Sequence, residues 1–190
     1  MVPVPRRGLT HRRNVIKVTL DTDVLPADDL LEAARGLDCE FAAVSVTDRE
    51  VAGTSFAAHV GPIGSVHETA LFGEARFGSA VFGSQKSDET LGEILRIIGT
   101  GSFPQLRANL SEGQLHQLRD ALILEAHIRE QRDIFITGDA RAFIRHGKRE
   151  ELRAAFGVRI LTRVEFLNAC TQNQLTAVYP AAARGGYTGF

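Results

Sequence analysis

Apolar residues recur along this chain with two different spacings. Continuous apolar or β-branched runs at 14–20, 40–46, 134–137 and 158–161 predict short buried strands. Helical spacing predicts helices over the intervening segments, at 26–38, 88–98, 111–131, 148–157 and 162–169. Because strands and helices alternate, we expect an α/β fold of three α/β/α layers around a central, mainly parallel sheet.

Polar and glycine residues mark where several of these helices begin and end. Ser111 with Gln114, and Thr162 with Glu165, have the spacing of capping boxes at helix starts. Gly99 and Gly157 follow the last apolar residues of two helices, where glycine commonly ends a helix.

Residues 53–104 depart from this pattern. The dipeptide Phe-Gly recurs there at Phe72, Phe77 and Phe82, a spacing of neither a helix nor a strand. We expect irregular turns with aromatic anchors, followed by the helix at 88–98. The segment is thus an insertion in a single domain over 14–170. A basic arm at 1–13 and a flexible tail at 171–190 flank that domain.

Acidic residues follow the predicted strands. Asp21 follows the first strand, Asp48 and Glu50 the second, and Asp139 the strand at 134–137. In parallel sheets, ligands bind outside the carboxyl ends of the strands. Asp120 lies 19 residues before Asp139, a spacing that a helix, a turn and a short strand fill. We therefore expect Asp120 to point at the same crevice from a helix N-terminus, with Asp48 and Glu50 as alternatives for the second acid.

Carboxylates gathered in one crevice repel one another unless they are protonated, paired with cations or bound to metal. An all-carboxylate set suits Mg²⁺ or Mn²⁺, and such a site can activate water for attack on phosphorus. Thr22 and Thr137 stand beside the acids as candidates to orient them. Arg141 and Arg145 are expected to share a helix face and to contact RNA phosphates.

Taken in order, four segments resemble the PIN-domain nuclease family: VTLDTDVL, AVSVTDREVAG, RDALILEAHIREQRDIFITGDARAF and VRILTRVEFL. The resemblance covers about 14–52 and 110–168. It implies metal-binding, catalytic acids at Asp21, Glu50, Asp120 and Asp139. It also implies hydrolysis of RNA phosphodiester bonds with one or two Mg²⁺ or Mn²⁺ ions, often as the toxin of a toxin–antitoxin pair. Asp23 stands where the family has Asn, which adds a charge and a further candidate ligand.

Composition narrows the remaining classes. Lys and Arg total 22 against 23 Asp and Glu, a net charge of −1, which excludes a bulk polycation that coats nucleic acid. Two cysteines without a CxxC exclude a disulfide scaffold and a thiolate zinc site, and favour the cytoplasm. No apolar run is long enough to predict a membrane span.

Two alternatives to a nuclease remain open. A haloacid-dehalogenase-like phosphatase would use the DxD of Asp21 and Asp23 and the late Gly138-Asp139. A non-catalytic PIN-like module would bind RNA or protein through the same fold. For the nuclease we expect an RNA substrate, an antitoxin protein as a partner, and a homodimer whose contact the glycine-rich insertion builds.

Overall fold

A computed structural model describes residues 15–55, 57–60, 63–70, 80–99 and 110–175. Its centre is a five-stranded sheet in the order β3-β2-β1-β6-β7, and each neighbouring pair is parallel. The strands are β1 (Ile16–Leu20), β2 (Cys39–Val44), β3 (Gly64–Val66), β6 (Ile134–Ile136) and β7 (Ile160–Leu161). The predicted parallel sheet is therefore confirmed.

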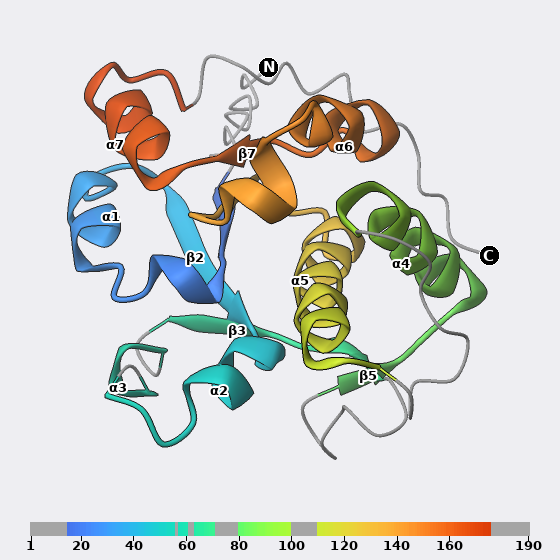
Figure 1. Ribbon diagram of the computed structural model, residues 1–190. Coiled ribbons are helices and arrows are strands. Elements are labelled where there is room, and N and C mark those ends of the chain that lie inside the picture. Colours follow the sequence, from blue (N-terminus) through green and yellow to red (C-terminus); the bar gives the residue numbers. More distant parts are fainter. Residues whose placement is uncertain (1–14, 56, 61–62, 71–79, 100–109, 176–190) are drawn as a thin grey trace, which may run out of the picture.

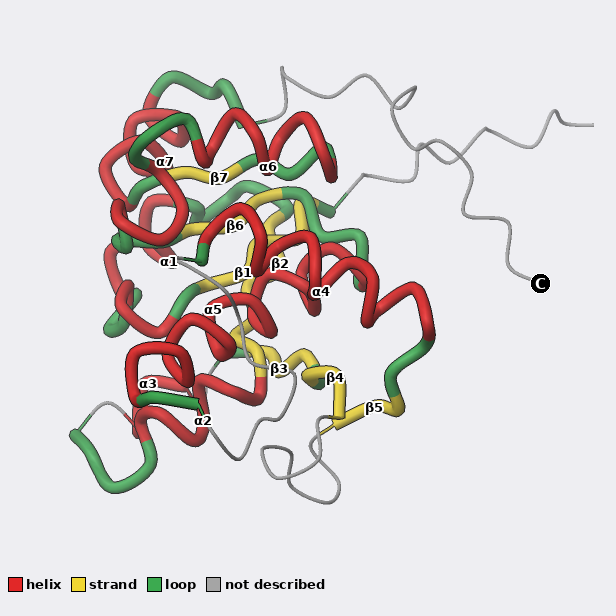
Figure 2. Tube along the Cα trace, turned by 45° about the vertical axis from the view of Figure 1, so that its right-hand side comes forward, coloured by secondary structure: helices red, strands yellow, loops and turns green. Residues whose placement is uncertain are grey.

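Helices cover both faces of this sheet (Figure 1). On one face lie α1 (Asp28–Ala33) and α7 (Arg163–Thr171). On the other lie α4 (Gln85–Ile98), α5 (Glu112–Arg129) and α6 (Lys148–Phe156). The tube in Figure 2 shows the same layering with the sheet between the two groups of helices. This arrangement is the predicted three-layer α/β/α fold.

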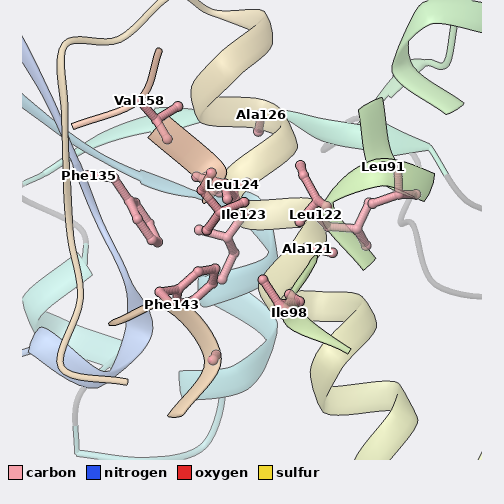
Figure 3. Packing of buried hydrophobic residues seen from close by; sticks show 14 of the residues in the cluster. Leu91, Ile98, Ala121, Leu122, Ile123, Leu124, Ala126, Phe135, Phe143 and Val158 are labelled. Carbon is pink, nitrogen blue, oxygen red and sulfur yellow. The ribbon is translucent and has the colours of Figure 1, made fainter. Parts of the chain in front are cut away.

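Successive side chains of the central strands pack alternately into two apolar clusters, one on each face of the sheet. Ile134 and Ile136 of β6 face the α1–α7 side, whereas Phe135 between them faces α5. Figure 3 shows Phe135 beside Phe143 and the apolar residues of α5. The two rings meet edge to face with centroids 5.2 Å apart. Because every side of β6 is buried, the strand is apolar without alternation in the sequence.

The segment at 53–104 is more ordered than predicted. It contains α3 (Ala57–Val60), the edge strand β3, and a second, two-stranded parallel sheet of β4 (Glu68–Ala70) and β5 (Ala80–Phe82) before α4. The expectation of irregular turns is therefore wrong. Phe82 is 99% exposed and anchors nothing, and Phe72 and Phe77 lie outside the described residues.

Two boundaries also differ from the prediction. The second strand ends at Val44 instead of Val46, and Ser45–Val51 form helix α2, which carries Glu50. Helix α5 begins at Glu112 after its Ser111 cap, so Asp120 lies within the helix and not at its N-terminus. Both capping boxes form as predicted, at Ser111 and Thr162.

The ends of the domain are described only in part. The predicted arm at 1–13 lies outside the described residues, as do residues 176–190 of the predicted tail. Leu175, within that tail, is buried in the α1–α7 cluster. Among the helices in the described part of the chain, none combines the length and apolar character needed to cross a bilayer.

Candidate active site

The site lies at the carboxyl ends of the two central strands. Asp21 follows β1 directly, and Asp139 comes three residues after the end of β6. The Asp21 backbone N–H donates to the Ile136 carbonyl at 2.9 Å, which continues the β1–β6 pairing past the strand ends. The two acidic loops are therefore neighbours because their strands are.

Thr137 links these two loops through its fully buried hydroxyl. The hydroxyl donates to Asp21 Oδ2 at 2.7 Å and accepts the Asp139 backbone N–H at 2.9 Å. Asp21 Oδ1 accepts the Thr22 N–H at 2.8 Å, so both oxygens of this buried carboxylate are oriented. Asp139 Oδ1 accepts the Ala142 N–H at 2.8 Å and caps the short π-helix η3 (Ala140–Ile144).

A second threonine orients the acid on α2. The Thr22 hydroxyl, in the 3-10 turn η1 (Thr22–Val24), donates to Glu50 Oε2 at 2.5 Å. The buried Thr47 hydroxyl lies 3.2 Å from the same Thr22 oxygen. The Asp48 side chain is exposed on α2. Its pKa is raised by partial desolvation, and none of the other acids contributes to that shift. Of the two alternatives, Glu50 is thus the one that lies with the other acids.

Asp23 and Asp120 complete the acidic cluster, which we define as Asp21, Asp23, Glu50, Asp120 and Asp139. Asp23 Oδ1 accepts the Gly138 N–H at 2.9 Å. A Cβ at position 138 would lie 2.9 Å from Asp23 Oδ2, so a side chain here would displace the Asp23 carboxylate. Asp120 lies on α5 within electrostatic range of the other four acids. Its charge raises the pKa of Asp21, and the charges of Asp139, Glu50 and Asp23 raise the pKa of Asp120.

Burial and mutual repulsion both act on these carboxyl groups. Burial, followed by the charges of Asp139, Glu50 and Asp23, raises the pKa of Asp120 to about 7. The pKa of Asp21 rises well above its usual value because the group is buried and lies near Asp23 and Asp120. The pKa of Asp23 is also raised, first by desolvation and then by Asp139 and Glu50. The fold therefore holds negative charges together at a cost in free energy.

No cation of the described chain offsets this charge. Among the described residues, no Lys or Arg side chain forms an ion pair with any member of the acidic cluster. In the same residues, no group of three His, Cys, Asp or Glu side chains stands close enough to ligate one ion. The acids are thus within electrostatic range of one another but are not drawn together as a closed ligand set.

A cavity of about 520 Å³ opens beside the acidic cluster. Asp120 and Asp139 line it, together with residues from the start of α5, from η3 and from the facing ends of α4 and α6: Ile98, Ser111, Gly113, Gln114, His116, Gln117, Arg141, Ala142 and Lys148. The cavity is therefore continuous with the acidic cluster and offers room for part of a substrate.

The two predicted RNA-contacting arginines separate in the structure. Arg141 is exposed and lines the cavity, whereas Arg145 is exposed but does not. Helix η3 ends at Ile144, so the two arginines do not share a helix face, and that expectation is wrong. The five-residue π-helix is capped by Asp139 at its start, and Arg145 follows its last residue in an extended conformation.

Sequence reasoning did not find the cavity or its other polar residues. His116 precedes Asp120 by four residues on α5, a spacing that places both on one helix face, and this signal was available. Lys148 donates to the carbonyls of Ile98 and Arg141, at 2.8 and 3.1 Å, and so fixes the cavity wall. No local pattern in the sequence predicts that contact.

No family model matches this chain. The curated proteins and the solved structures likewise contain no match. The assignment of a function therefore depends on the site itself and on the resemblance of its motifs.

Proposed function

We propose that this protein is a metal-dependent endoribonuclease that hydrolyses RNA phosphodiester bonds at the acidic cluster. One observation carries the proposal. Five carboxylates lie within electrostatic range of one another beside the carboxyl ends of the central strands, and in the described chain no basic side chain pairs with them. Protonation relieves this repulsion in the metal-free protein, as the raised pKa values of Asp21, Asp23 and Asp120 indicate, and a bound cation would relieve it with the carboxylates charged.

The donor set fits a hard divalent cation. Asp21, Glu50, Asp120 and Asp139 offer only carboxylate oxygens, the ligands that Mg²⁺ and Mn²⁺ prefer, and Asp23 adds a further carboxylate. When bound, such an ion supplies an activated water and neutralises charge that develops on the phosphate. One or two ions are both compatible with this number of oxygens.

The chain itself supplies orientation. Thr137 holds Asp21 and the Asp139 loop in one geometry, and Thr22 holds Glu50 against the first strand. Asp23 ties the two loops through Gly138. These contacts are set before a substrate arrives, so less reorganisation is required during the reaction.

The position of Asp120 favours the nuclease over a haloacid-dehalogenase-like phosphatase. The phosphatase alternative gives this residue no role, whereas here it lies within the cluster with its pKa raised to about 7. Four further parts of the proposal depend on the family resemblance and the composition alone. They are a role as a toxin, an antitoxin partner, a homodimer built through residues 53–104 and a cytoplasmic location.

The direct test is cleavage of defined RNAs by the purified protein in Mg²⁺ or Mn²⁺. We expect cleavage that EDTA abolishes and that Asp21→Asn abolishes, while the variant remains folded and at least as stable as the wild type without metal. Arg35→Ala serves as a folded control, because that exposed residue, which follows α1 and pairs with Glu32, lies outside the cavity. Wild-type cleavage rates in a clean Asp21→Asn preparation would rule out the assigned role.

A further inference from the structure

The cavity beside the acidic cluster is lined by both acidic and basic side chains. Asp120 and Asp139 are its acidic residues. Arg141 and His116 also line the cavity, and within the described residues the side chain of neither forms a hydrogen bond or an ion pair. The guanidinium of Arg141 is therefore available to a ligand.

The backbone that carries Arg141 is firmly held although its side chain is free. Lys148 donates to the Arg141 carbonyl and to the Ile98 carbonyl, which ties η3 to the end of α4. Asp139 caps the same helix through the Ala142 N–H. A guanidinium on a fixed backbone is preorganised for an anion, because less freedom is lost on binding.

The acidic and the basic lining residues together define the chemistry of a ligand in this cavity. A group that enters must carry a second anion to meet Arg141 and His116 while its reacting phosphate lies at the carboxylates. A volume of about 520 Å³ is sufficient for one nucleotide-sized group. Arg binds phosphate through paired N–H donors, and an imidazole N–H can add a third.

We propose that this cavity is a nucleotide subsite in which Arg141 and His116 hold the phosphate next to the scissile one. The inference rests on the proposed nuclease function and deepens it. It assigns His116 as a substrate-contacting residue and requires a substrate with a phosphate on the cavity side. The enzyme would then prefer internal bonds to a terminal bond that lacks this phosphate.

The test couples a protein residue to a single phosphate. Binding of fluorescent hexaribonucleotides is measured by anisotropy in Ca²⁺, on RNA shown by gel to stay intact. Each hexamer has one linkage replaced by an uncharged methylphosphonate, and the replacement is moved through all positions. The proteins are the full chain, Arg141→Ala, His116→Ala and the matched control Arg145→Ala. Arg141→Gln serves as a second variant, and thermal melting checks that each is folded.

We expect Arg141→Ala to weaken binding of the unmodified RNA about tenfold, the effect of losing charged hydrogen bonds to one phosphate. At one linkage, the methylphosphonate should weaken RNA binding by the wild type by a similar factor. The same replacement should weaken RNA binding by the Arg141→Ala variant by less than about twofold. His116→Ala should show the same reduced sensitivity at that linkage. Arg145→Ala should show no such dependence. Equal effects of the two arginines, coupling at no linkage, or no binding by the wild type would overturn the subsite.

Cleavage of a longer RNA by the wild type in Mg²⁺ is scored separately. Cleavage without coupling removes the subsite and leaves the nuclease. Coupling without cleavage leaves the phosphate subsite and removes the nuclease. Failure of both experiments removes both proposals.

Discussion

At the scale of single residues, one hydroxyl sets much of the geometry of the site. Thr137 is fully buried between Asp21 Oδ2 and the Asp139 N–H, and its hydroxyl satisfies both. The sequence identified Thr137 and Thr22 as neighbours of the acids, because both stand within two residues of one. It could not predict which acid each threonine contacts, because that depends on the pairing of β1 with β6.

Replacing Thr137 with valine keeps the shape of the side chain but leaves a buried carboxylate oxygen and a backbone N–H without their partner. We expect Thr137→Val to lower the free energy of unfolding by about 1–3 kcal/mol, measured by urea unfolding in EDTA. Thr137→Ser keeps the hydroxyl and should lose less. Equal stability of the valine and serine variants would show that these hydrogen bonds contribute little.

Asp120 predicts a pH dependence with a definite sign. Its pKa of about 7 in the folded protein lies above the value of about 3.9 for an unfolded chain, so the native state retains a proton that the unfolded state releases. Its contribution to stability is therefore fully present below about pH 4 and is lost as the pH rises towards 7. Asp120→Asn should remove this loss and stabilise the metal-free protein at pH 7 more than at pH 4.5.

His127 opposes that trend and must be separated from it. Burial, with the nearby Arg132 charge, lowers the pKa of His127 to about 3, so its contribution to stability is lost as the pH falls below about 6.5. The quantity to measure is thus the difference in unfolding free energy between Asp120→Asn and the wild type, from pH 4.5 to 7 in EDTA. We expect the difference to grow with pH, and a constant difference would contradict the raised pKa.

At the scale of elements, the helix caps were the most predictable features. Thr162 Oγ1 accepts the Glu165 N–H at 3.2 Å, and Glu165 Oε2 accepts the Thr162 N–H at 2.7 Å, as the spacing predicts. Glu165 also pairs with Arg149 of α6 at 2.8 Å, so this cap joins two helices on either side of β7. The cap could be predicted because it is local, whereas the Arg149 contact could not.

Loss of this cap should destabilise the protein without affecting the site. We expect Thr162→Ala to lower the free energy of unfolding by about 1 kcal/mol, a decrease in Tm of about 2–4 °C for a chain of this size. RNA cleavage below the melting range should be unchanged. Thr162→Ser retains the acceptor and should melt close to the wild type, and identical melting of the alanine and serine variants would argue against the cap.

Helix α2 shows where local patterns fail. The β-branched Val46 favours a strand that continues to this residue, yet Val46 and the β-branched Thr47 lie in the first turn of a helix. Both are fully buried, and Val46 packs in the same cluster as α5. Packing against a distant helix therefore overrides local preference, and this places Glu50 where Thr22 can reach it.

At the scale of the whole molecule, the layers could be predicted but the edge of the sheet could not. Strand β3 has only three residues, and its parallel pairing with β2 is fixed by contacts distant in sequence. The Phe-Gly repeats of the same segment predict aromatic anchors and not strands, and Phe82 is exposed. Short parallel strands have no periodic signal long enough to distinguish them from turns.

The cluster also depends on the whole fold, because its acids come from two loops, after β1 and after β6, and from two helices, α2 and α5. No segment holds more than two of them close together in sequence. A cation that binds only the folded arrangement must therefore stabilise the entire domain. For an ion bound with a Kd of about 1 mM, 10 mM would add about 1.4 kcal/mol, or about 3–6 °C in Tm.

The most direct measurement is thermal unfolding of the full chain during a titration with Mn²⁺ or Mg²⁺, in parallel with Asp21→Asn. The account predicts that the wild-type Tm rises with the concentration of either ion, and that the variant, although at least as stable at the start, gains far less. A wild-type Tm that does not respond to millimolar divalent ion, or that rises equally in both proteins, would contradict a cation site at the acidic cluster.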